Sequence, residues 1–492
     1  MEKNLTCFIR FSDRESVEQT INILKDQVVV KDVVIVGGDD TLAFPEGMNV
    51  SFLKSDNFAS SATLKQMAAM AETPWVLVYS GLSGPPDPGK YSLNRMIQAC
   101  RDTGAGMVYS DYYERRNNTV IPYPLIDYQE GSLRDDFNFG PVILYNGSAF
   151  RNACARMERE YKFAGLYDLR LKISQDHPLL HLPEYLYTVE ETDKRKSGEK
   201  QHDYVDPRNR AVQIEMEFVC TDHLKEINAW LKPVFDKISF REEEFENEAS
   251  VIIPVRNRVK TIGDAIASVL SQEAPFSFNL IVVDNHSTDG TTELIKSFAQ
   301  NDKRLIHHIP DRKDLGIGGC WNEGIFHPEC GKFSIQLDSD DLYIDNSVIV
   351  RIVDSFYSQQ CAMVIGSYQM VNFDLEEIPP GLIDHSEWTP ENGRNNALRI
   401  NGLGAPRAFY TPVIRRIGIP DVSYGEDYAA GLAVSRSYQI GRIYESLYLC
   451  RRWEGNTDAA LDIASVNAHN LYKDRIRTME LMARKKLIEE TK

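Results

Sequence analysis

The chain has 492 residues, which is longer than one ordinary hydrophobic core and predicts two domains. Its formal net charge of −17 argues against nucleic acid as a partner, because binding to phosphate backbones needs a basic surface. Hydrophobic residues make up 42% of the chain and charged residues 26%, which is typical of a soluble globular protein.

Cysteines and apolar stretches indicate the compartment. No stretch is apolar over the length that a membrane-spanning helix needs, and the first residues do not have the pattern of a signal peptide. The 8 cysteines are scattered singly, which favours reduced thiols over a disulfide framework or a zinc site. We therefore expect a cytoplasmic protein, with peripheral attachment to the inner face of a membrane left open.

The first half of the chain contains short apolar segments that predict strands of an α/β domain over residues 1–210. These segments are Cys7–Arg14, Val33–Thr41, Trp75–Ser83, Met107–Tyr113 and Leu182–Tyr187. Residues 193–208 are polar and without pattern, and they predict a loop that closes this domain.

The middle of the chain is expected to connect two domains. Residues 211–231 have apolar side chains at helical spacing and predict a long connecting helix. An acidic run at residues 241–248 follows and predicts a solvated linker. We therefore divide the chain into a first domain over 1–210, a connecting segment over 211–245 and a second domain over 246–492.

The second domain begins with alternating strand and helix patterns. Apolar runs at Ala249–Val255 and Leu280–Asp284 predict strands, and residues 260–272 and 291–298 predict helices. This alternation predicts a mostly parallel, Rossmann-like sheet, whose ligands lie beyond the carboxyl ends of the strands. Asp284 should therefore line a crevice at that edge of the sheet.

An acidic cluster follows the next predicted strand, Phe333–Leu337. Asp338, Asp340 and Asp341 lie together on the turn after that strand. Crowded carboxylates repel one another unless a cation neutralises them, and Mg²⁺ or Mn²⁺ prefers such oxygen ligands. The cluster therefore predicts a metal site, and a solvated acidic loop or a helix N-cap is the alternative.

Four segments, in this order, resemble the family 2 glycosyltransferases. They are Val251–Arg258, Val282–Thr291, Gln336–Asp341 and Tyr424–Tyr428, and the resemblance spans roughly residues 249–455. It implies a GT-A fold and transfer of a sugar from a nucleotide diphosphate donor, usually with inversion. One departure is Trp321, which stands where the family usually has an Arg before the Asn matched by Asn322.

The resemblance also implies roles for individual residues. Asp427 would act as the catalytic base, with Glu426 as the second candidate, although both acids would also favour a helix N-terminus. Asp338, Asp340 and Asp341 would bind Mn²⁺ or Mg²⁺, and His385 is a further candidate ligand. The expected donor-binding residues are Pro254, Arg256, Asn257, Asp284, Asn322, Asp338, Ser339, Arg452 and Trp453, with surface salt bridging as the alternative for Arg452.

The first domain resembles a degenerate copy of the second. Gly37 stands where Asp284 stands, and Ser80, Leu82 and Ser83 fall where the three aspartates of the cluster lie. Asp168 falls near the position of Asp427. We therefore expect two tandem GT-A-like domains, of which the first is not catalytic and serves as a docking platform or a surface for self-association. The alternative is that both halves are parallel α/β domains whose strands merely look alike.

We expect a nucleotide diphosphate sugar as the donor, a UDP-sugar in preference to others, and a glycan, a lipid-linked sugar or a small molecule as the acceptor. Two other functions stay open. One is a scaffold that binds glycans or nucleotide sugars without catalysis, which would not require Asp338, Asp340, Asp341, Glu426 and Asp427 to be kept together. The other is a retaining transferase on the same fold, in which Asp427 would be a binding residue.

Overall fold

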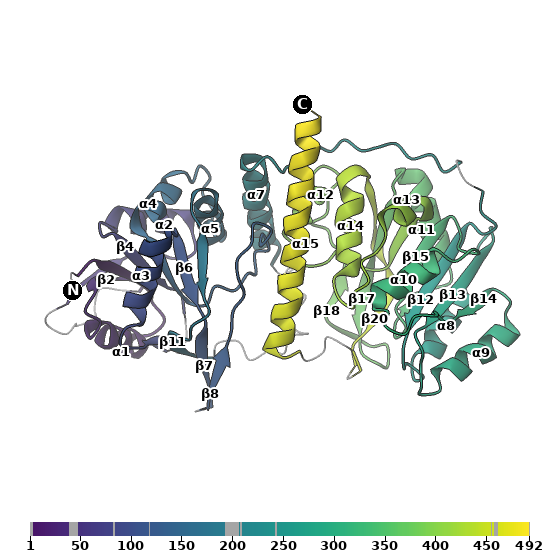
Figure 1. Cartoon of the computed structure of the whole chain (residues 1–492), viewed down its shortest axis with the longest axis horizontal. Helices are drawn as coiled ribbons and strands as arrows, with labels where there is room; N and C mark the ends of the chain where they lie inside the picture. Colours follow the sequence, from purple (N-terminus) through teal and green to yellow (C-terminus); the bar gives the residue numbers. More distant parts are fainter. Residues whose placement is uncertain are drawn as a thin grey trace. The chain divides into compact units, whose positions relative to one another are not determined.

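The computed structural model describes residues 3–38, 48–81, 84–117, 119–191, 206, 209–241, 244–453, 455–456 and 461–491. Its described residues group into two compact units. The first unit consists of residues 1–197, 210–229 and 461–481, and the second of residues 198–209, 230–460 and 482–492. Figure 1 shows both units as sheets flanked by helices, so the predicted α/β fold class is confirmed.

The first unit contains a seven-stranded sheet with the order β10-β6-β9-β4-β1-β2-β3. These strands are β1 (Leu5–Arg10), β2 (Val30–Val36), β3 (Asn49–Leu53), β4 (Trp75–Tyr79), β6 (Met107–Ser110), β9 (Val142–Asn146) and β10 (Leu179–Leu182). A smaller sheet is formed by β5 (Asp87–Pro88), β7 (Tyr112–Arg116), β8 (Thr119–Tyr123) and β11 (Tyr187–Glu190). The helices are α1 (Arg14–Lys25), α2 (Ser61–Met70), α3 (Ser92–Thr103), α4 (Gly147–Ala155), α5 (Gly165–Asp176) and α7 (Arg210–Glu226).

The second unit is built on a nine-stranded sheet with the order β14-β13-β12-β15-β19-β17-β20-β16, and β18 pairs with β17. Its strands are β12 (Ala249–Val255), β13 (Phe278–Asp284), β14 (Leu305–His308), β15 (Phe333–Gln336), β16 (Leu342–Tyr343), β17 (Met363–Val371), β18 (Glu377–Ile383), β19 (Arg407–Tyr410) and β20 (Ile440–Arg451). β12 and β13 are buried along their whole length, because helices cover a parallel sheet.

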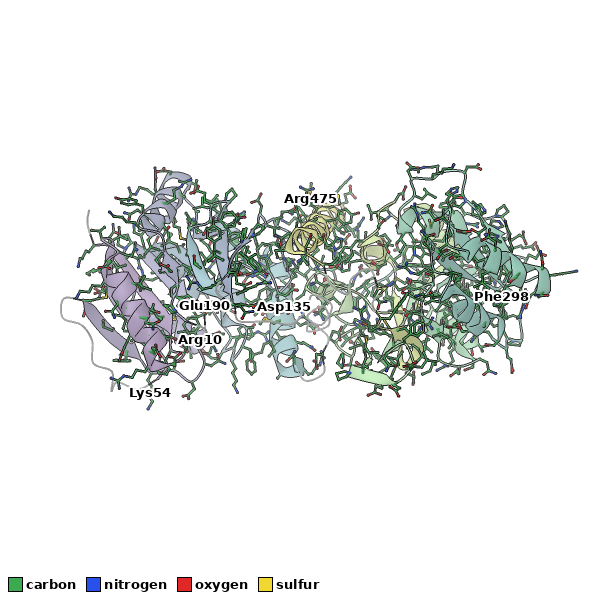
Figure 2. All side chains as sticks on the ribbon, turned by 90° about the horizontal axis from the view of Figure 1, so that it is seen from below. Arg10, Lys54, Asp135, Glu190, Phe298 and Arg475 are labelled. Carbon is green, nitrogen blue, oxygen red and sulfur yellow. The ribbon has the colours of Figure 1, made fainter. Side chains whose placement is uncertain are left out.

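The helices of the second unit cover this sheet. They are α8 (Ile262–Leu270), α9 (Thr291–Asn301), α10 (Ile317–Ile325), α11 (Val348–Gln359), α12 (Gly393–Asn396), α13 (Thr411–Ile417) and α14 (Glu426–Ser437). α10 packs on β12 and β13, whereas α11 packs on β17 and β20. Phe298, labelled in Figure 2, lies on α9 and approaches Gly263 of α8.

The two sheets share one strand order. The order β3-β2-β1-β4-β9-β6-β10 of the first unit matches β14-β13-β12-β15-β19-β17-β20 of the second. In both sheets one antiparallel strand lies at the same place: β9 is beside β4 in the first unit, and β19 is beside β15, which precedes the predicted metal site, in the second. A chance likeness of apolar segments would not reproduce this order, so the two units are copies of one topology.

The register of the paired strands shows which residues correspond. Trp75 pairs with Leu5 of β1 as Phe333 pairs with Ala249 of β12. Ser80 therefore takes the place of Asp338, as the sequence predicts, and Gly37 follows β2 where Asp284 ends β13. Leu82 and Ser83 lie outside the described residues, as does all of the predicted loop 193–208 except Asp206.

The helix expected to connect the domains belongs to the first unit. It spans Arg210–Glu226, and its Glu215 carboxylate accepts hydrogen bonds from the backbone N–H groups of Lys162, Phe163 and Ala164 at 3.0, 2.6 and 3.1 Å. These bonds satisfy donors of the turn before α5 and hold α7 to that unit. The sequence alone shows only an amphipathic helix, so this partner could not be predicted.

The last helix, α15 (Ile463–Glu490), has residues in both units. Its residues up to Leu481 group with the first unit, whereas the sequence assigned the whole C-terminal tail to the second domain. In the first unit, the fully buried Asp474 pairs with Arg477 at 2.8 Å and with Arg134 at 3.3 Å. Ser132 also donates a hydrogen bond to the Asp474 carboxylate.

We expect Asp474→Asn to lower the free energy of unfolding by about 3–5 kcal/mol, because the buried Arg477 would lose its ion pair with Asp474 and the buried Arg134 would keep only its pair with Asp136. Urea unfolding measures this loss. Arg475→Gln is the matched control, because Arg475 is the next residue of the same helix but is exposed; it is labelled in Figure 2. Equal effects of the two substitutions would contradict a stabilising role for the buried cluster.

Among the residues that the structure describes, no helix combines the length and the apolar character needed to cross a membrane.

Candidate active site

The aspartate cluster lies where β15 ends, as the sequence predicts. Gln336, the last residue of β15, donates a hydrogen bond to Asp338 Oδ1 at 3.0 Å, and the Asp338 amide donates to the Tyr448 hydroxyl at 3.1 Å. Burial and the charge of Asp340 raise the pKa of Asp338, although Arg407 opposes the rise. The cluster therefore has an excess of negative charge that a cation would relieve.

Asp340 is joined to the segment after β20. Its Oδ2 accepts hydrogen bonds from Trp453 Nε1 and Asn456 Nδ2, both at 3.2 Å. The Trp453 ring also contacts Phe373, with a centroid distance of 5.6 Å. Trp453 therefore lies beside the cluster, and its role in donor binding stays a prediction.

Asp341 is the most deeply buried residue of the cluster and has a hydrogen-bond partner within the protein. Only 5% of the residue is exposed, and its Oδ1 accepts a hydrogen bond from the Arg451 amide at 2.8 Å. Burial, with the charges of Asp340 and Asp338, raises the pKa of Asp341 well above its usual range. Arg451 is itself buried and pairs with Asp264 at 2.9 Å. We therefore build the proposed metal site on Asp338 and Asp340, and Asp341 as a further ligand stays a prediction.

The acid pair opens α14, as the sequence predicts. Gly425 precedes the helix with φ 80°, a left-handed conformation that glycine adopts readily, and Glu426 and Asp427 occupy the first turn. Glu426 is buried, and burial together with the charge of Asp427 raises the pKa of Glu426 to about 8. Asp427 is more accessible, with 26% of its side chain exposed.

Arg407 joins the acid pair to the aspartate cluster. Its Nη2 lies 2.8 Å from Asp427 Oδ2, and its Nη1 donates to Gln336 Oε1 at 2.7 Å. Gln336 in turn binds Asp338, so one cation links the predicted base to the predicted metal ligand. Sequence reasoning missed Arg407. The available signal was a single charged residue in the otherwise apolar stretch 405–414.

Asp284 ends β13 and organises the loop that follows. Its carboxylate accepts hydrogen bonds from the Ser287 amide at 3.0 Å and the Thr292 hydroxyl at 2.5 Å, and it lies 3.3 Å from His307 Nε2. Burial alone would raise the pKa of Asp284, but the hydrogen bonds from His307, Thr292 and Ser287 lower it well below its usual range. Because the residue is fully buried, it shapes the loop and offers no exposed surface to a nucleoside.

We expect Asp284→Ala to lower the free energy of unfolding by about 3 kcal/mol, because charge-assisted hydrogen bonds each contribute about 1.5–3 kcal/mol. The folded-state pKa lies below the ordinary value of about 3.9, so this stabilisation is present above about pH 4 and is lost as the pH falls. Urea unfolding between pH 7 and pH 3 measures both effects. An alanine variant as stable as the wild type would contradict this role.

The three donor-binding residues predicted at the end of β12 and just after it have different surroundings. Pro254 is buried in the strand. Asn257 has φ 55°, and its Oδ1 accepts a hydrogen bond from the Thr288 amide at 2.8 Å, so its side chain joins two loops. Arg256 is exposed at the end of the strand, which leaves its guanidinium accessible to a ligand.

Asn322 has a structural role. Its Nδ2 donates to the Ile419 carbonyl at 2.7 Å, and its Oδ1 accepts from the Ile419 amide at 3.0 Å. With both ends of the amide group used, we remove Asn322 from the donor-binding residues. The neighbouring Trp321 is buried and carries no charge, so it does not replace the Arg that the family usually has at this position.

The other predicted residues lie as follows. Ser339 is half-buried between Asp338 and Asp340, and the half-buried Arg452 donates its amide to the Val371 carbonyl at 2.7 Å. His385 is buried, its Nδ1 lies 2.9 Å from Glu387 Oε1, and its ring packs near Tyr368. This pairing with Glu387 gives His385 a local partner.

A divalent ion fits this arrangement only if a bound substrate supplies some of the oxygen atoms that coordinate it. Among the described residues, no three His, Cys, Asp or Glu side chains are arranged to hold a metal ion. Asp338 and Asp340 offer hard oxygen ligands and excess negative charge. Mg²⁺ is commonly bound by one or two carboxylates together with substrate phosphates, and this donor set fits that mode.

Residues 250–416 match the family model described as Glycosyl transferase family 2. An uncharacterized glycosyltransferase of Rickettsia felis is 36% identical over 221 residues, which are 44% of this chain and 35% of that protein. The UDP-Glc:alpha-D-GlcNAc-diphosphoundecaprenol beta-1,3-glucosyltransferase WfgD of Escherichia coli is 28% identical over 123 residues, 25% of this chain and 46% of that one.

The chain spans about a third or less of the length of the first curated relatives that it matches. Among solved structures, S. aureus TarS 1-349 in complex with UDP aligns with a TM-score of 0.38 and 20% identity over 49% of this chain and 69% of that one. The matched residues 250–416 contain the aspartate cluster and Arg407 and lie within the second unit. The second unit therefore contains a glycosyltransferase family 2 domain.

Proposed function

We propose that the second unit transfers a sugar from a nucleotide diphosphate sugar to an acceptor hydroxyl, with a divalent ion and inversion at the anomeric carbon. The observation that supports this most is the contact set of Arg407. It brings the predicted base, Asp427, and the predicted metal ligand, Asp338, to one place although they are far apart in the chain.

Asp338 and Asp340 would hold Mn²⁺ or Mg²⁺, and the ion would supply positive charge to the leaving diphosphate. Asp427 would accept the proton of the acceptor hydroxyl as that oxygen attacks the sugar. Glu426, whose pKa is raised to about 8, holds its proton at neutral pH and so does not compete as a base. Arg256 and Arg452 are the proposed cations for the diphosphate, and Trp453 is the proposed surface for the sugar.

The donor is proposed to be a UDP-sugar. The name of the Escherichia coli relative includes UDP-Glc as donor and a diphosphoundecaprenol-linked sugar as acceptor, which supports this donor class and a lipid-linked acceptor. A lipid-linked acceptor would also agree with peripheral attachment to the inner face of a membrane, which the sequence leaves open. The first unit, which has Ser80 in place of Asp338, is proposed to be non-catalytic and to act in docking or self-association.

A donor-hydrolysis screen across UDP-, GDP-, ADP- and dTDP-sugars, with Mn²⁺, Mg²⁺ or EDTA, tests the proposed function. We expect hydrolysis that depends on the metal and on one class of base. Hydrolysis of no donor, together with retained binding of a nucleotide sugar, would favour the non-catalytic scaffold. Analysis of the product anomer separates inversion from retention.

A further inference from the structure

We propose that Arg407 is a positioning residue that selects Asp427 as the ionised member of the acid pair and holds its carboxylate toward the acceptor. This inference rests on the proposed function, because it assigns a role within that reaction. It concerns a residue outside the motifs by which the sequence resembles its family.

The contacts of Arg407 restrain it from three directions. Nε donates to the Gly404 carbonyl at 2.9 Å, Nη1 donates to Gln336 Oε1 at 2.7 Å, and Nη2 faces Asp427 Oδ2 at 2.8 Å. Only 14% of the side chain is exposed. A planar guanidinium with its donors fixed in this way can hold a carboxylate in one orientation, which a flexible ammonium cannot do equally well.

The charges around Asp427 explain why the pair needs a selector. Glu426 is adjacent on α14 and buried, and the negative charge of Asp338, after the end of β15, also acts on Glu426, so several carboxylates share this region. Two close carboxylates do not both ionise easily, and one of them retains a proton. Arg407 forms its ion pair with Asp427. This positive charge favours the ionised form of Asp427, so the shared proton is favoured on Glu426.

The first unit provides an internal comparison. The register of β4 with β9 and of β15 with β19 places Val78 where Gln336 lies and Ile143 where Arg407 lies. Ser80 replaces Asp338 in the same unit. Its Asp168, in the first turn of α5, pairs with Lys172 of its own helix at 3.4 Å. The unit that lacks the aspartate of the cluster therefore also lacks the arginine and the glutamine.

Arg407→Gln and Arg407→Lys test the proposal, with Arg415→Gln as the control. Arg415 lies in the same unit and donates to the carbonyls of Ile325 and His327, but its described bonds involve no carboxylate. Hydrolysis of the most active donor from the screen is measured against pH, and binding of UDP with Mn²⁺ is measured by calorimetry. Loss of the cation should favour the protonated form of Asp427, so the acidic limb of the kcat profile should move to higher pH.

We expect Arg407→Gln to reduce kcat at pH 7 by about a hundredfold, with UDP affinity within threefold of the wild type. Arg407→Lys should recover part of kcat, and Arg415→Gln should leave the pH profile in place. If UDP affinity fell and the acidic limb stayed fixed, Arg407 would be a phosphate ligand and the proposal would be overturned. An unchanged kcat would also overturn it.

A measurement without turnover separates this inference from the proposed function. In a double-mutant cycle of unfolding with Arg407→Gln and Asp427→Asn, each of which removes the charge on one side of the pair, we expect the two side chains to be coupled by at least tenfold in the unfolding equilibrium. A coupling near onefold would mean that the two side chains act independently, and it would overturn the proposal that Arg407 restrains Asp427. If the wild type hydrolysed no donor but the coupling was present, the proposed function would fail and the electrostatic restraint would stand.

Discussion

Asp340→Ala is expected to abolish both transfer and Mn²⁺-dependent donor binding while the protein stays folded. The carboxylate is one of the two proposed protein ligands of the ion, and an alanine offers no oxygen to replace it. Thermal stability should hold or rise, because the charge of Asp340 disfavours ionisation of both Asp338 and Asp341. Calorimetric titration with UDP, with and without Mn²⁺, and a transfer assay measure the two losses.

The matched control is Asp345→Ala. Asp345 is close in sequence and is exposed, and its carboxylate caps the Ser347 amide and pairs with Arg351 away from the cluster. It should leave metal-dependent binding unchanged and lower stability slightly. Undiminished turnover of the Asp340 variant would show that the metal site is elsewhere or that the reaction needs no metal.

Asp427→Asn is expected to slow transfer by about a hundredfold or more, with donor affinity nearly unchanged. Loss of a general base typically reduces the rate by about 10²–10⁴-fold, and the amide keeps the shape of the side chain without accepting a proton. Because Arg407 pairs with this carboxylate, the amide should also weaken that contact. Steady-state kinetics with separate kcat and donor Kd values make the distinction.

Glu426→Gln is the companion variant. It imitates the protonated acid, so near pH 7 it should affect the rate much less than Asp427→Asn. Folding raises the pKa of Glu426 from 4.5 to about 8, so the unfolded chain ionises first and the wild type loses stability progressively between these two pH values; the glutamine variant should gain relative stability across this range and keep that gain above about pH 8. A larger loss of rate in the Glu426 variant would exchange the roles of the two acids. Loss of donor affinity in the Asp427 variant would make Asp427 a donor ligand.

Much of the fold could be predicted from local patterns. The apolar runs that end at Asp284 and Leu337 predict strands, and the structure places β13 and β15 there. Parallel pairing follows from the alternation with helices. The antiparallel insertion of β19 beside β15 could not be predicted, because it depends on contacts between segments about 70 residues apart that no local pattern encodes. The partners of α7 and α15 escaped prediction for the same reason.

The site could be predicted only at the level of position along the chain. Asp338, Asp340, Glu426 and Asp427 lie at the element ends where sequence placed them. The hydrogen-bond partners of individual side chains could not be predicted: Asp341 accepts from the Arg451 amide, and Asn322 binds the Ile419 backbone. Arg407 could not be predicted as a site residue, because its partners come from β15 and α14. A single arginine in a strand also forms no motif with its neighbours in the sequence.

The loop after β13 is already ordered by bonds within the protein. Asn257 accepts from the Thr288 amide, Asp289 accepts from the Val259 amide at 3.1 Å, and Asp284 binds Ser287 and Thr292. Because the loop is already ordered, a ligand that contacts this edge of the sheet would not have to order it, and the protein would lose little conformational entropy on association. The affinity for a nucleotide would then depend mainly on the contacts between nucleotide and protein. A substitution that weakens one of the bonds within the loop would reduce this affinity even though the substituted residue does not contact the nucleotide.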